Sequence, residues 1–337
     1  MIAYTIRRLL AAFVLLLIMT VVTFAIFFAS PSDPARLACG KNCTPTLLEQ
    51  TRKAYGYDQP ITTQYGRFMV GLVKGRDYPE NAELRKAAPE LITHCSAPCL
   101  GYSPNKTALV LDLIKDRLPV SIYVAIFAFV LWIVFGISGG LVAALFRGRW
   151  PDRSLVGLSL VGYSFPTFFI GLTLYNYVAL KWQLVPIPEY IKPTADFVGF
   201  LRGAILPAIT LALIYIAAYI RLTRAYVLEA MAEDYLRTAR AKGLGEGKVL
   251  FKHTLRAALT PITTIAGLDL GALLAGAAIT ETVFGFNGVG KLAVDSAVNQ
   301  DLPTNVGIVL VAATFILVAN IVVDVLYAFI DPRVKYS

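Results

Sequence analysis

Six long apolar stretches decide what this sequence can fold into. They are residues 9–29, 118–146, 154–180, 205–228, 258–283 and 306–329. Each is long enough to cross a lipid bilayer, because a helix needs about 20 apolar residues to span the hydrocarbon core. Of the residues, 57% are hydrophobic and only 16% are charged, a balance that a water-exposed globular surface cannot accommodate. We therefore predict an all-α polytopic membrane protein with six transmembrane helices.

The distribution of lysine and arginine predicts the orientation of these helices. With the N-terminus inside, the short cytoplasmic segments carry fifteen basic residues and the short external loops carry four. The cytoplasmic set comprises Arg7 and Arg8, three arginines between residues 147 and 153, eight basic residues between Arg221 and Arg256, and Arg333 and Lys335. Because basic residues are enriched in cytoplasmic loops, both termini are predicted to lie inside. The net charge of +9 then reflects topology and attraction to the inner leaflet rather than nucleic-acid binding.

This topology divides the chain into three predicted parts. Residues 1–29 form a cytoplasmic N-terminus and the first transmembrane helix, residues 30–117 an extracytoplasmic subdomain, and residues 118–337 a five-helix core. The core carries a long cytoplasmic loop at 229–256. The first span could instead be a cleaved signal sequence. Its apolar run of about 21 residues exceeds the ~7–15 of such sequences, so a retained anchor is the preferred interpretation.

All four cysteines fall in the predicted external segment: Cys39, Cys43, Cys95 and Cys99. An oxidising compartment favours disulfides. Four cysteines allow three pairings, and the sequence does not choose among them. Zinc binding by the two C-x-x-x-C pairs and free thiols remain alternatives, although this spacing is not a usual zinc motif.

Chemistry-bearing motifs are sparse. The sequence contains no H-E-x-x-H and no G-x-S-x-G. Asp269, Glu281 and Asp324 are carboxylates within or near predicted spans, and such residues are functional candidates by default. A proton-coupled carrier could use them. Glu281 and Asp324 lie near span ends, where we expect solvation at the membrane interface, whereas Asp269 lies well inside its span.

The stretch GFNGVGKL, residues 285–292, is similar in spacing to a phosphate-binding loop. Such a loop needs a Ser or Thr hydroxyl after its lysine to hold magnesium, and a buried strand before it. Here Leu292 follows Lys291, and a long apolar run precedes the stretch. We therefore expect this chain to bind no ATP.

The longest cytoplasmic loop has helical periodicity. One face of the pattern holds Leu228, Met231, Ala232, Tyr235, Leu236 and Ala239, and the other holds Glu229, Glu233, Arg237 and Arg240. Glu233 and Arg237 have the i, i+4 spacing of a stabilising pair. Gly243 predicts a helix stop with Lys242 in the last turn, and a second helix is predicted from Glu246 past Pro261. The loop is a predicted helix-turn-helix under the bilayer, or alternatively a simple interfacial connection.

The run DYLRTARAKGL, residues 234–244, followed by HTLRAALTPI, resembles the cytoplasmic coupling loop of permease subunits of ATP-binding-cassette importers of the dipeptide/oligopeptide class. Other stretches resemble the same class: IRRLL near the start, SDPA at 32–35, GYSFPTFFIGL at 162–172, ILPAITLAL at 205–213, ITETVFGFNGVGKL at 279–292 and VVDVLYAFIDPRV near the end. An apparent insert at about 79–100, with two of the cysteines, departs from the class.

The resemblance implies a non-catalytic subunit in a bacterial or archaeal plasma membrane that binds no cofactor itself. It would pair with a second, homologous permease and dock two ATPase subunits, which hold ATP and Mg. An external substrate-binding protein would deliver short peptides, with nickel, glutathione or haem as alternatives. A stand-alone proton-coupled secondary transporter is the alternative from a different class.

The resemblance also implies site residues. The ATPase-coupling residues are Asp234, Tyr235, Arg237, Thr238, Ala239, Arg240, Ala241, Lys242, Gly243 and Leu244. Within them, Arg237, Thr238 and Ala239 stand where the general family motif has Glu-Ala-Ala, and Gly243 stands at its glycine. Because the glutamate is replaced, its pairing with an ATPase arginine is not implied here. The candidates for the translocation path or gate are Tyr163, Ser164, Pro166, Asp269 and Glu281.

We predict that the isolated chain has no magnesium-dependent affinity for nucleotide, because Leu292 removes the metal-holding hydroxyl. Equilibrium binding of ATP to the purified subunit measures this, with Lys291→Ala as the comparison. Specific binding that Lys291→Ala abolishes would contradict the interpretation.

Overall fold

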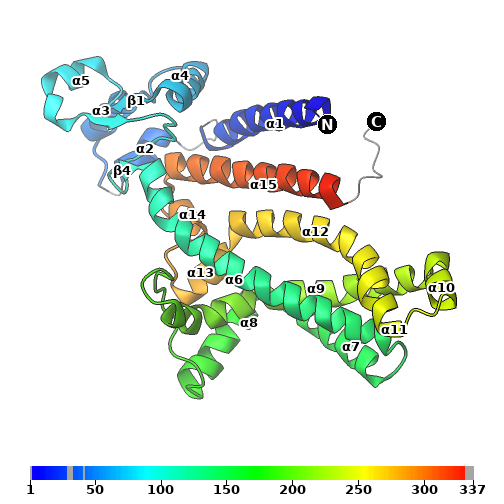
Figure 1. Cartoon of the computed structure of the whole chain (residues 1–337). Coiled ribbons are helices and arrows are strands. Elements are labelled where there is room, and N and C mark those ends of the chain that lie inside the picture. The colour runs from blue at the N-terminus through cyan, green and yellow to red at the C-terminus, as the bar shows by residue number, and fades with distance from the viewer. Residues whose placement is uncertain (1, 29–32, 41, 331–337) are drawn as a thin grey trace. The chain divides into compact units, whose positions relative to one another are not determined.

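The computed structural model describes residues 2–28, 33–40 and 42–330, and it is predominantly helical (Figure 1). The first elements are α1 (Ile2–Phe28), α2 (Pro34–Cys39), α3 (Pro45–Ala54), α4 (Ile61–Lys74), β1 (Arg76–Tyr78), α5 (Ala82–Ala87), η1 (Pro89–Leu91), β2 (Thr93–Cys95), β3 (Tyr102–Ser103) and β4 (Ala108–Leu109). The later elements are α6 (Val110–Leu145), α7 (Trp150–Ser164), α8 (Thr167–Leu174), η2 (Tyr175–Lys181), α9 (Phe197–Ala232), α10 (Asp234–Ala241), α11 (Glu246–Lys248), η3 (Val249–Thr254), α12 (Leu255–Gly276), α13 (Ala278–Phe284), α14 (Val289–Val298) and α15 (Leu302–Ile330). Ser32, Arg333, Lys335 and the side chain of Asp324 lie outside the described part of the chain.

Within the described residues, five helical stretches are long and apolar enough to cross a membrane, and a bent pair of helices makes a sixth candidate. Five are single helical stretches: Ile6–Phe28, Val110–Leu145, Phe197–Ala232, Glu246–Leu274 and Leu302–Val322. The sixth is the pair of α7 with residues Thr167–Lys181, when this bent pair counts as one span. The predicted all-α class is confirmed, and the six segments agree with the predicted number. The orientation with both termini inside stays a prediction.

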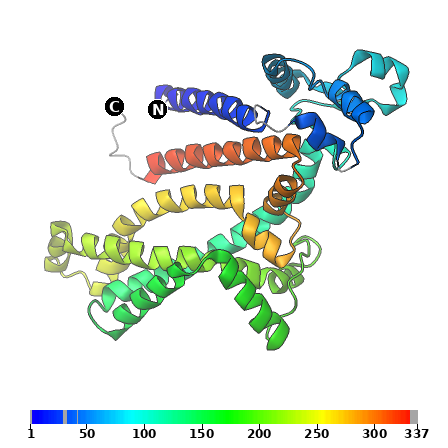
Figure 2. The ribbon, with the colours of Figure 1, turned by 180° about the vertical axis from the view of Figure 1, so that it is seen from behind.

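The predicted continuous helix over 154–180 is wrong. α7 ends at Ser164, and the helical stretch that follows, Thr167–Lys181, leaves at an angle of 99° (Figure 2). Phe165 is extended, with φ −94° and ψ 135°. Pro166 explains this, because its ring disfavours the helical conformation of the preceding residue and it carries no N–H for the helix ladder.

The predicted span 258–283 is also interrupted. α12 ends at Gly276, and Ala277 leaves the helical region with ψ 24° before α13 begins. Glycine has the weakest helix propensity after proline, which favours an end at this position. α13 then closes on Gly285, which has φ 71° in the left-handed region. The last part of the predicted span is therefore a separate short helix.

The first of two compact units comprises residues 1–119 and 287–314. It holds two small antiparallel sheets, in which Arg76 lies opposite Cys95 and Tyr102 lies opposite Leu109. Phe24 of α1 packs on Tyr65 and Phe68 of α4. These contacts tie the first span to the segment that follows it.

Both cysteine pairs in this unit are disulfides. Cys39 bonds to Cys43, and Cys95 bonds to Cys99, so each bridge joins residues four positions apart. The prediction of disulfides is confirmed, and the structure selects one of the three pairings that the sequence left open. The zinc alternative is wrong, because disulfide sulfurs provide no thiolate ligand.

The second compact unit comprises residues 120–286 and 315–337, of which 331–337 are outside the described part. Within it α9 packs against α7 and α12. Trp132, Tyr219 and Ile262 are among its largest fully buried side chains. α9 begins where the Asp196 carboxylate accepts a hydrogen bond from the Gly199 amide, and it continues for 36 residues. The three-part division by side of the membrane stays a prediction, since contacts group the chain differently.

Glycines on α6 allow its backbone to approach α9 closely. A Cβ atom at Gly140 would lie 2.5 Å from the Thr223 Cβ and 2.7 Å from the Ile220 carbonyl oxygen. A Cβ atom at Gly136 would lie 2.6 Å from the Tyr219 Cβ. Small residues at helix interfaces are the common means of tight packing between membrane helices.

We predict that Gly140→Val destabilises the folded protein by about 1–3 kcal/mol, because extra carbons in a packed interface force backbone shifts. Thermal unfolding of the detergent-solubilised chain measures the effect. Gly157→Val on α7 is the matched control, since no atom lies within 4 Å of the position its Cβ would take. Equal melting temperatures for the two variants would contradict the prediction.

Candidate functional site

The segment expected to carry coupling is a short helix held by one buried side chain. α9 stops at Ala232, and Glu233 is extended with ψ 139° before α10 begins. The predicted uninterrupted apolar face from Leu228 to Ala239 is therefore wrong. Leu236 is fully buried, and α10 packs on η3. The single anchor leaves most of α10 exposed beyond the end of α9 (Figure 1).

The turn after α10 has the predicted left-handed glycine. Gly243 has φ 80°, and its amide donates to the Arg240 carbonyl at 2.9 Å. The Leu244 amide donates to the Ala239 carbonyl at 3.3 Å. α10 ends at Ala241, just before this turn, so the predicted helix stop at Gly243 is confirmed. A residue with a Cβ would be strained at this φ.

Charged pairs on α10 differ from the predicted pair. Arg237 lies 3.4 Å from the Asp234 carboxylate. The sequence pattern had predicted that Arg237 pairs with Glu233 instead. The reason is that Glu233 is not helical and so does not lie one turn before Arg237. Across the glycine turn, the Arg240 Nε donates to Glu246 Oε1 at 3.0 Å. This pair links the end of α10 to the start of α11.

Three of the five path candidates meet at the break between α7 and α8. Tyr163 and Ser164 are exposed at the end of α7, and Pro166 caps the start of α8. The Ser164 hydroxyl donates to the Leu160 carbonyl at 2.8 Å. The Arg221 guanidinium of α9 lies over the Tyr163 ring, 5.1 Å from its centre. An aromatic ring and a cation therefore flank the break.

A buried ion pair joins α7 to α9. Arg224 donates twice to Asp152, from Nε to Oδ1 at 2.6 Å and from Nη2 to Oδ2 at 2.8 Å. The Gly148 amide also donates to Asp152 Oδ2 at 2.9 Å. Asp152 is only 4% exposed. Such a bidentate pair fixes both distance and angle between the two helices.

The other two path candidates lie at different contacts. Asp269 of α12 accepts a hydrogen bond from the Tyr219 hydroxyl of α9 at 2.7 Å. Glu281 accepts from the Ser121 hydroxyl at 2.6 Å and is 2% exposed. The expected interfacial solvation of Glu281 is therefore wrong, because α13 packs against α8 and α9 instead of continuing the span.

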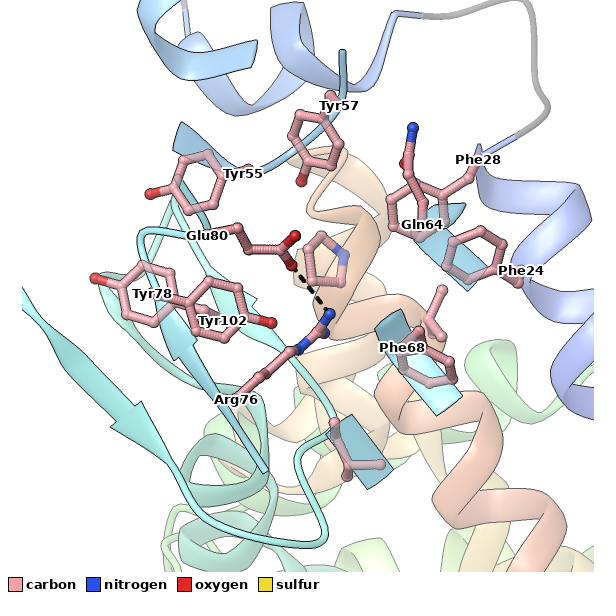
Figure 3. Close-up of a pocket in the computed structure, with 13 residues that line it drawn as sticks. Phe24, Phe28, Tyr55, Tyr57, Gln64, Phe68, Arg76, Tyr78, Glu80 and Tyr102 are labelled. Carbon is pink, nitrogen blue, oxygen red and sulfur yellow. Dashed lines mark hydrogen bonds and ion pairs between the residues drawn. The ribbon is translucent and has the colours of Figure 1, made fainter. Parts of the chain in front are cut away.

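An aromatic pocket lies in the first unit (Figure 3). The Arg76 guanidinium pairs with Glu80 at 3.2 Å and lies 5.0 Å from the centre of the Tyr78 ring. Burial raises the pKa of Tyr55 to about 12, with a further contribution from Tyr102, and burial also raises the pKa of Tyr57. Both hydroxyls therefore stay protonated to a higher pH than the hydroxyl of an exposed tyrosine. The cavity of about 40 Å³ has room for a few water molecules but not for a peptide.

A larger groove of about 490 Å³ lies in the second unit. Apolar side chains from α6, α12 and α15 dominate its lining, among them Ile133, Leu270 and Phe315. A peptide backbone there would leave most of its N–H and C=O groups without partners, which is unfavourable. The groove is suited to apolar groups and not to a polar substrate.

The stretch GFNGVGKL joins α13 to α14. Leu292 is fully buried where a phosphate-binding loop has its hydroxyl, and Lys291 Nζ donates to Asn287 Oδ1 at 3.1 Å. Helix α14 begins at Val289, so the lysine lies within its first turn. These positions agree with the interpretation that the glycine-lysine spacing is incidental.

Comparison with known proteins gives the family. A family model described as the inner membrane component of binding-protein-dependent transport systems matches residues 136–336, and the N-terminal model of such membrane components matches residues 1–125. The glutathione transport system permease protein GsiC of Escherichia coli K12 is 35% identical over 340 residues, covering all of both chains. A protein of Brucella abortus named for peptide transport system permease function is 34% identical over 337 residues, again covering both chains. This chain belongs to that permease family.

The permease is thus a multi-pass inner membrane protein of an ATP-binding-cassette importer. Its predicted coupling residues lie together on α10 and the turn that follows, at 234–244. Its five path candidates do not form one cluster: three lie at the α7–α8 break, and no described hydrogen bond joins any two of the five.

Sequence reasoning missed Arg221 and Arg224, which were assigned to a cytoplasmic loop. Both lie within α9, because that helix continues to Ala232. A signal was present, since both arginines fall inside the predicted apolar stretch 205–228, and charged residues in a span are rare and usually functional or paired. Asp152, 72 positions away, could not be matched to Arg224 from spacing alone.

We predict that Asp152→Asn destabilises the permease by about 2–3 kcal/mol, because it leaves the Arg224 charge without its partner. This is below the usual loss of about 3–5 kcal/mol for a fully buried pair, since the Arg224 side chain is 30% exposed. Asp234→Asn is the matched control, because the Asp234–Arg237 pair is almost fully exposed and should have no measurable effect. Thermal unfolding of both variants decides, and an unchanged melting temperature for Asp152→Asn would refute the prediction.

Proposed function

We propose that the chain is the membrane-spanning subunit through which an ATP-driven importer moves short peptides into the cell. An external substrate-binding protein delivers the peptide, and a second, homologous permease completes the path. The observation that carries this proposal is α10, an exposed helix with a left-handed glycine turn at the position where the family has its coupling motif. The family description and the full-length similarity to peptide and glutathione permeases support it.

In this proposal two partner ATPases bind ATP and Mg, and the chain itself is non-catalytic. Residues 234–244 form the docking surface on the cytoplasmic side, with Tyr235, Arg237 and Lys242 exposed. One extended residue, Glu233, separates α10 from α9, and α10 packs on η3, which leads directly into α12. A rigid-body movement of the ATPases therefore reaches two spans at once.

Further links extend that movement. The Asp152–Arg224 pair joins α9 to α7, and the Tyr219–Asp269 hydrogen bond joins α9 to α12. Bistable helix packing transmits small displacements because packed interfaces do not deform continuously. The α7–α8 break is then the place where a shift of α7 relative to α8 opens or closes the path.

Glutathione is the second candidate substrate, because a relative named for glutathione transport is as similar as the one named for peptides. The importer assembled with its partners in proteoliposomes separates the candidates. We expect trialanine to stimulate ATP hydrolysis and to accumulate inside, more than glutathione does. Preference for glutathione would reassign the substrate, and uptake driven by a proton gradient without ATP would establish the lone-carrier alternative.

We predict that Gly243→Val reduces ATP-driven uptake at least about tenfold, because a β-branched residue is strained at φ 80° and re-aims α10. Capture of peptide by the binding protein should not change. Co-purification of the ATPases and uptake into proteoliposomes measure the two effects.

Gly247→Val is the matched control. Gly247 lies in the same cytoplasmic segment, has no positive φ, and has open space around its Cβ position. We expect it to retain most uptake. Full uptake by Gly243→Val would show that α10 does not couple the ATPases to the spans.

A further inference from the structure

Arg221 is a cation within α9, a helix long and apolar enough to cross a membrane, and it has no anionic partner among the described residues. Its Nε is buried and has no hydrogen-bond partner. The contact that the structure gives its guanidinium is the face of the Tyr163 ring, at 5.1 Å. Charged groups inside spans are unfavourable unless they pair, face a water-filled path or bind a ligand.

Arg224, on the same helix, is by comparison an arginine with a structural role. It lies three residues further along α9 and makes both of its bonds to Asp152. Asp152 accepts hydrogen bonds from Arg224 and from the Gly148 amide, and no described hydrogen bond joins it to Arg221. Of these two neighbouring arginines of α9, Arg224 thus has a carboxylate partner and Arg221 has none among the described residues.

The direction of Arg221 argues against a side chain that merely extends to the membrane surface. Asp152 and Tyr163 are eleven residues apart on α7, which is about 16 Å along a helix axis, while the two arginines are only about 4.5 Å apart along α9. The two guanidinium groups therefore reach in opposite directions. Arg224 reaches the start of α7, next to the basic residues at 147–153, and Arg221 reaches the α7–α8 break.

We propose that Arg221 binds the carboxylate of the transported substrate as it passes the α7–α8 break. The inference rests on the proposed function, because peptides and glutathione both carry free carboxylates. A guanidinium presents paired N–H donors that match a carboxylate, and the Tyr163 ring holds it in place from one face. Tyr163 is 55% exposed, so the site is open on the side of the break.

Uptake of trialanine and of its C-terminal amide by the reconstituted importer tests the inference. Each uptake rate is normalised to the amount of probe that the binding protein captures, which removes the selectivity of that protein. We expect Arg221→Gln to lower the acid-to-amide ratio about 10- to 100-fold, the range for loss of a charge-assisted hydrogen bond. Arg221→Lys should keep part of the ratio, because it keeps the charge but not the paired donors.

Arg224→Gln is the control for a structural effect, and it should lower both rates together. An unchanged acid-to-amide ratio in Arg221→Gln would overturn the inference while leaving the importer function intact. If the wild-type importer moved neither probe with ATP, the proposed function would fail instead, and the following measurement would still decide on Arg221.

Accessibility gives that independent measurement. In the assembled importer, Arg221→Cys should react with the anionic, membrane-impermeant reagent sulfonatoethyl methanethiosulfonate, because the site opens to a water-filled path. Thr223→Cys is the buried control, since Thr223 is fully buried against Gly140. The native cysteines are disulfide-bonded and do not compete. Equal protection of the two introduced thiols would contradict a path at Arg221.

Discussion

Backbone hydrogen bonding in a medium without water governs this molecule. Inside a bilayer each N–H and C=O group must find its partner within the protein, so spans are long helices and interruptions need local compensation. The α7–α8 break follows this rule: Pro166 has no N–H to satisfy, and the Ser164 hydroxyl bonds back to the helix carbonyl at Leu160. Among the described residues, the candidate span that bends by 99° does so next to polar side chains from two helices.

Features set by local chemistry could be predicted from the sequence. The apolar stretches predicted which parts of the chain are long and apolar enough to cross a membrane, since length and composition suffice for that. Gly243 marked the end of α10, because only glycine takes that backbone conformation without strain. The break of the helix at Phe165 was not predicted, although the sequence contains Pro166 at that point. The apolar composition runs through it unchanged, and prolines are tolerated inside membrane helices, as Pro119 and Pro207 are here.

Features set by tertiary contacts could not be read from the sequence. The burial of Leu236 depends on η3 folding back against α10, and the burial of Glu281 depends on the turn at Ala277. Asp152 and Arg224 lie in different helices, so their separation in the sequence does not predict that they pair. For the candidate site, the sequence predicted the turn at Gly243, which the structure has, whereas the coupling role of 234–244 and the path candidates stay predictions. Arg221 was counted only as a basic residue of the cytoplasmic side, although it lies inside the predicted apolar stretch 205–228.

The short span of each disulfide has a consequence for how the protein is made. Because Cys39–Cys43 and Cys95–Cys99 each join neighbours four positions apart, each partner is the nearest cysteine as the chain is translocated. On the external side that we propose, the first bridge can close before the second pair has crossed the membrane. Correct pairing then needs no rearrangement by an isomerase, and the oxidation of one bridge is independent of the other.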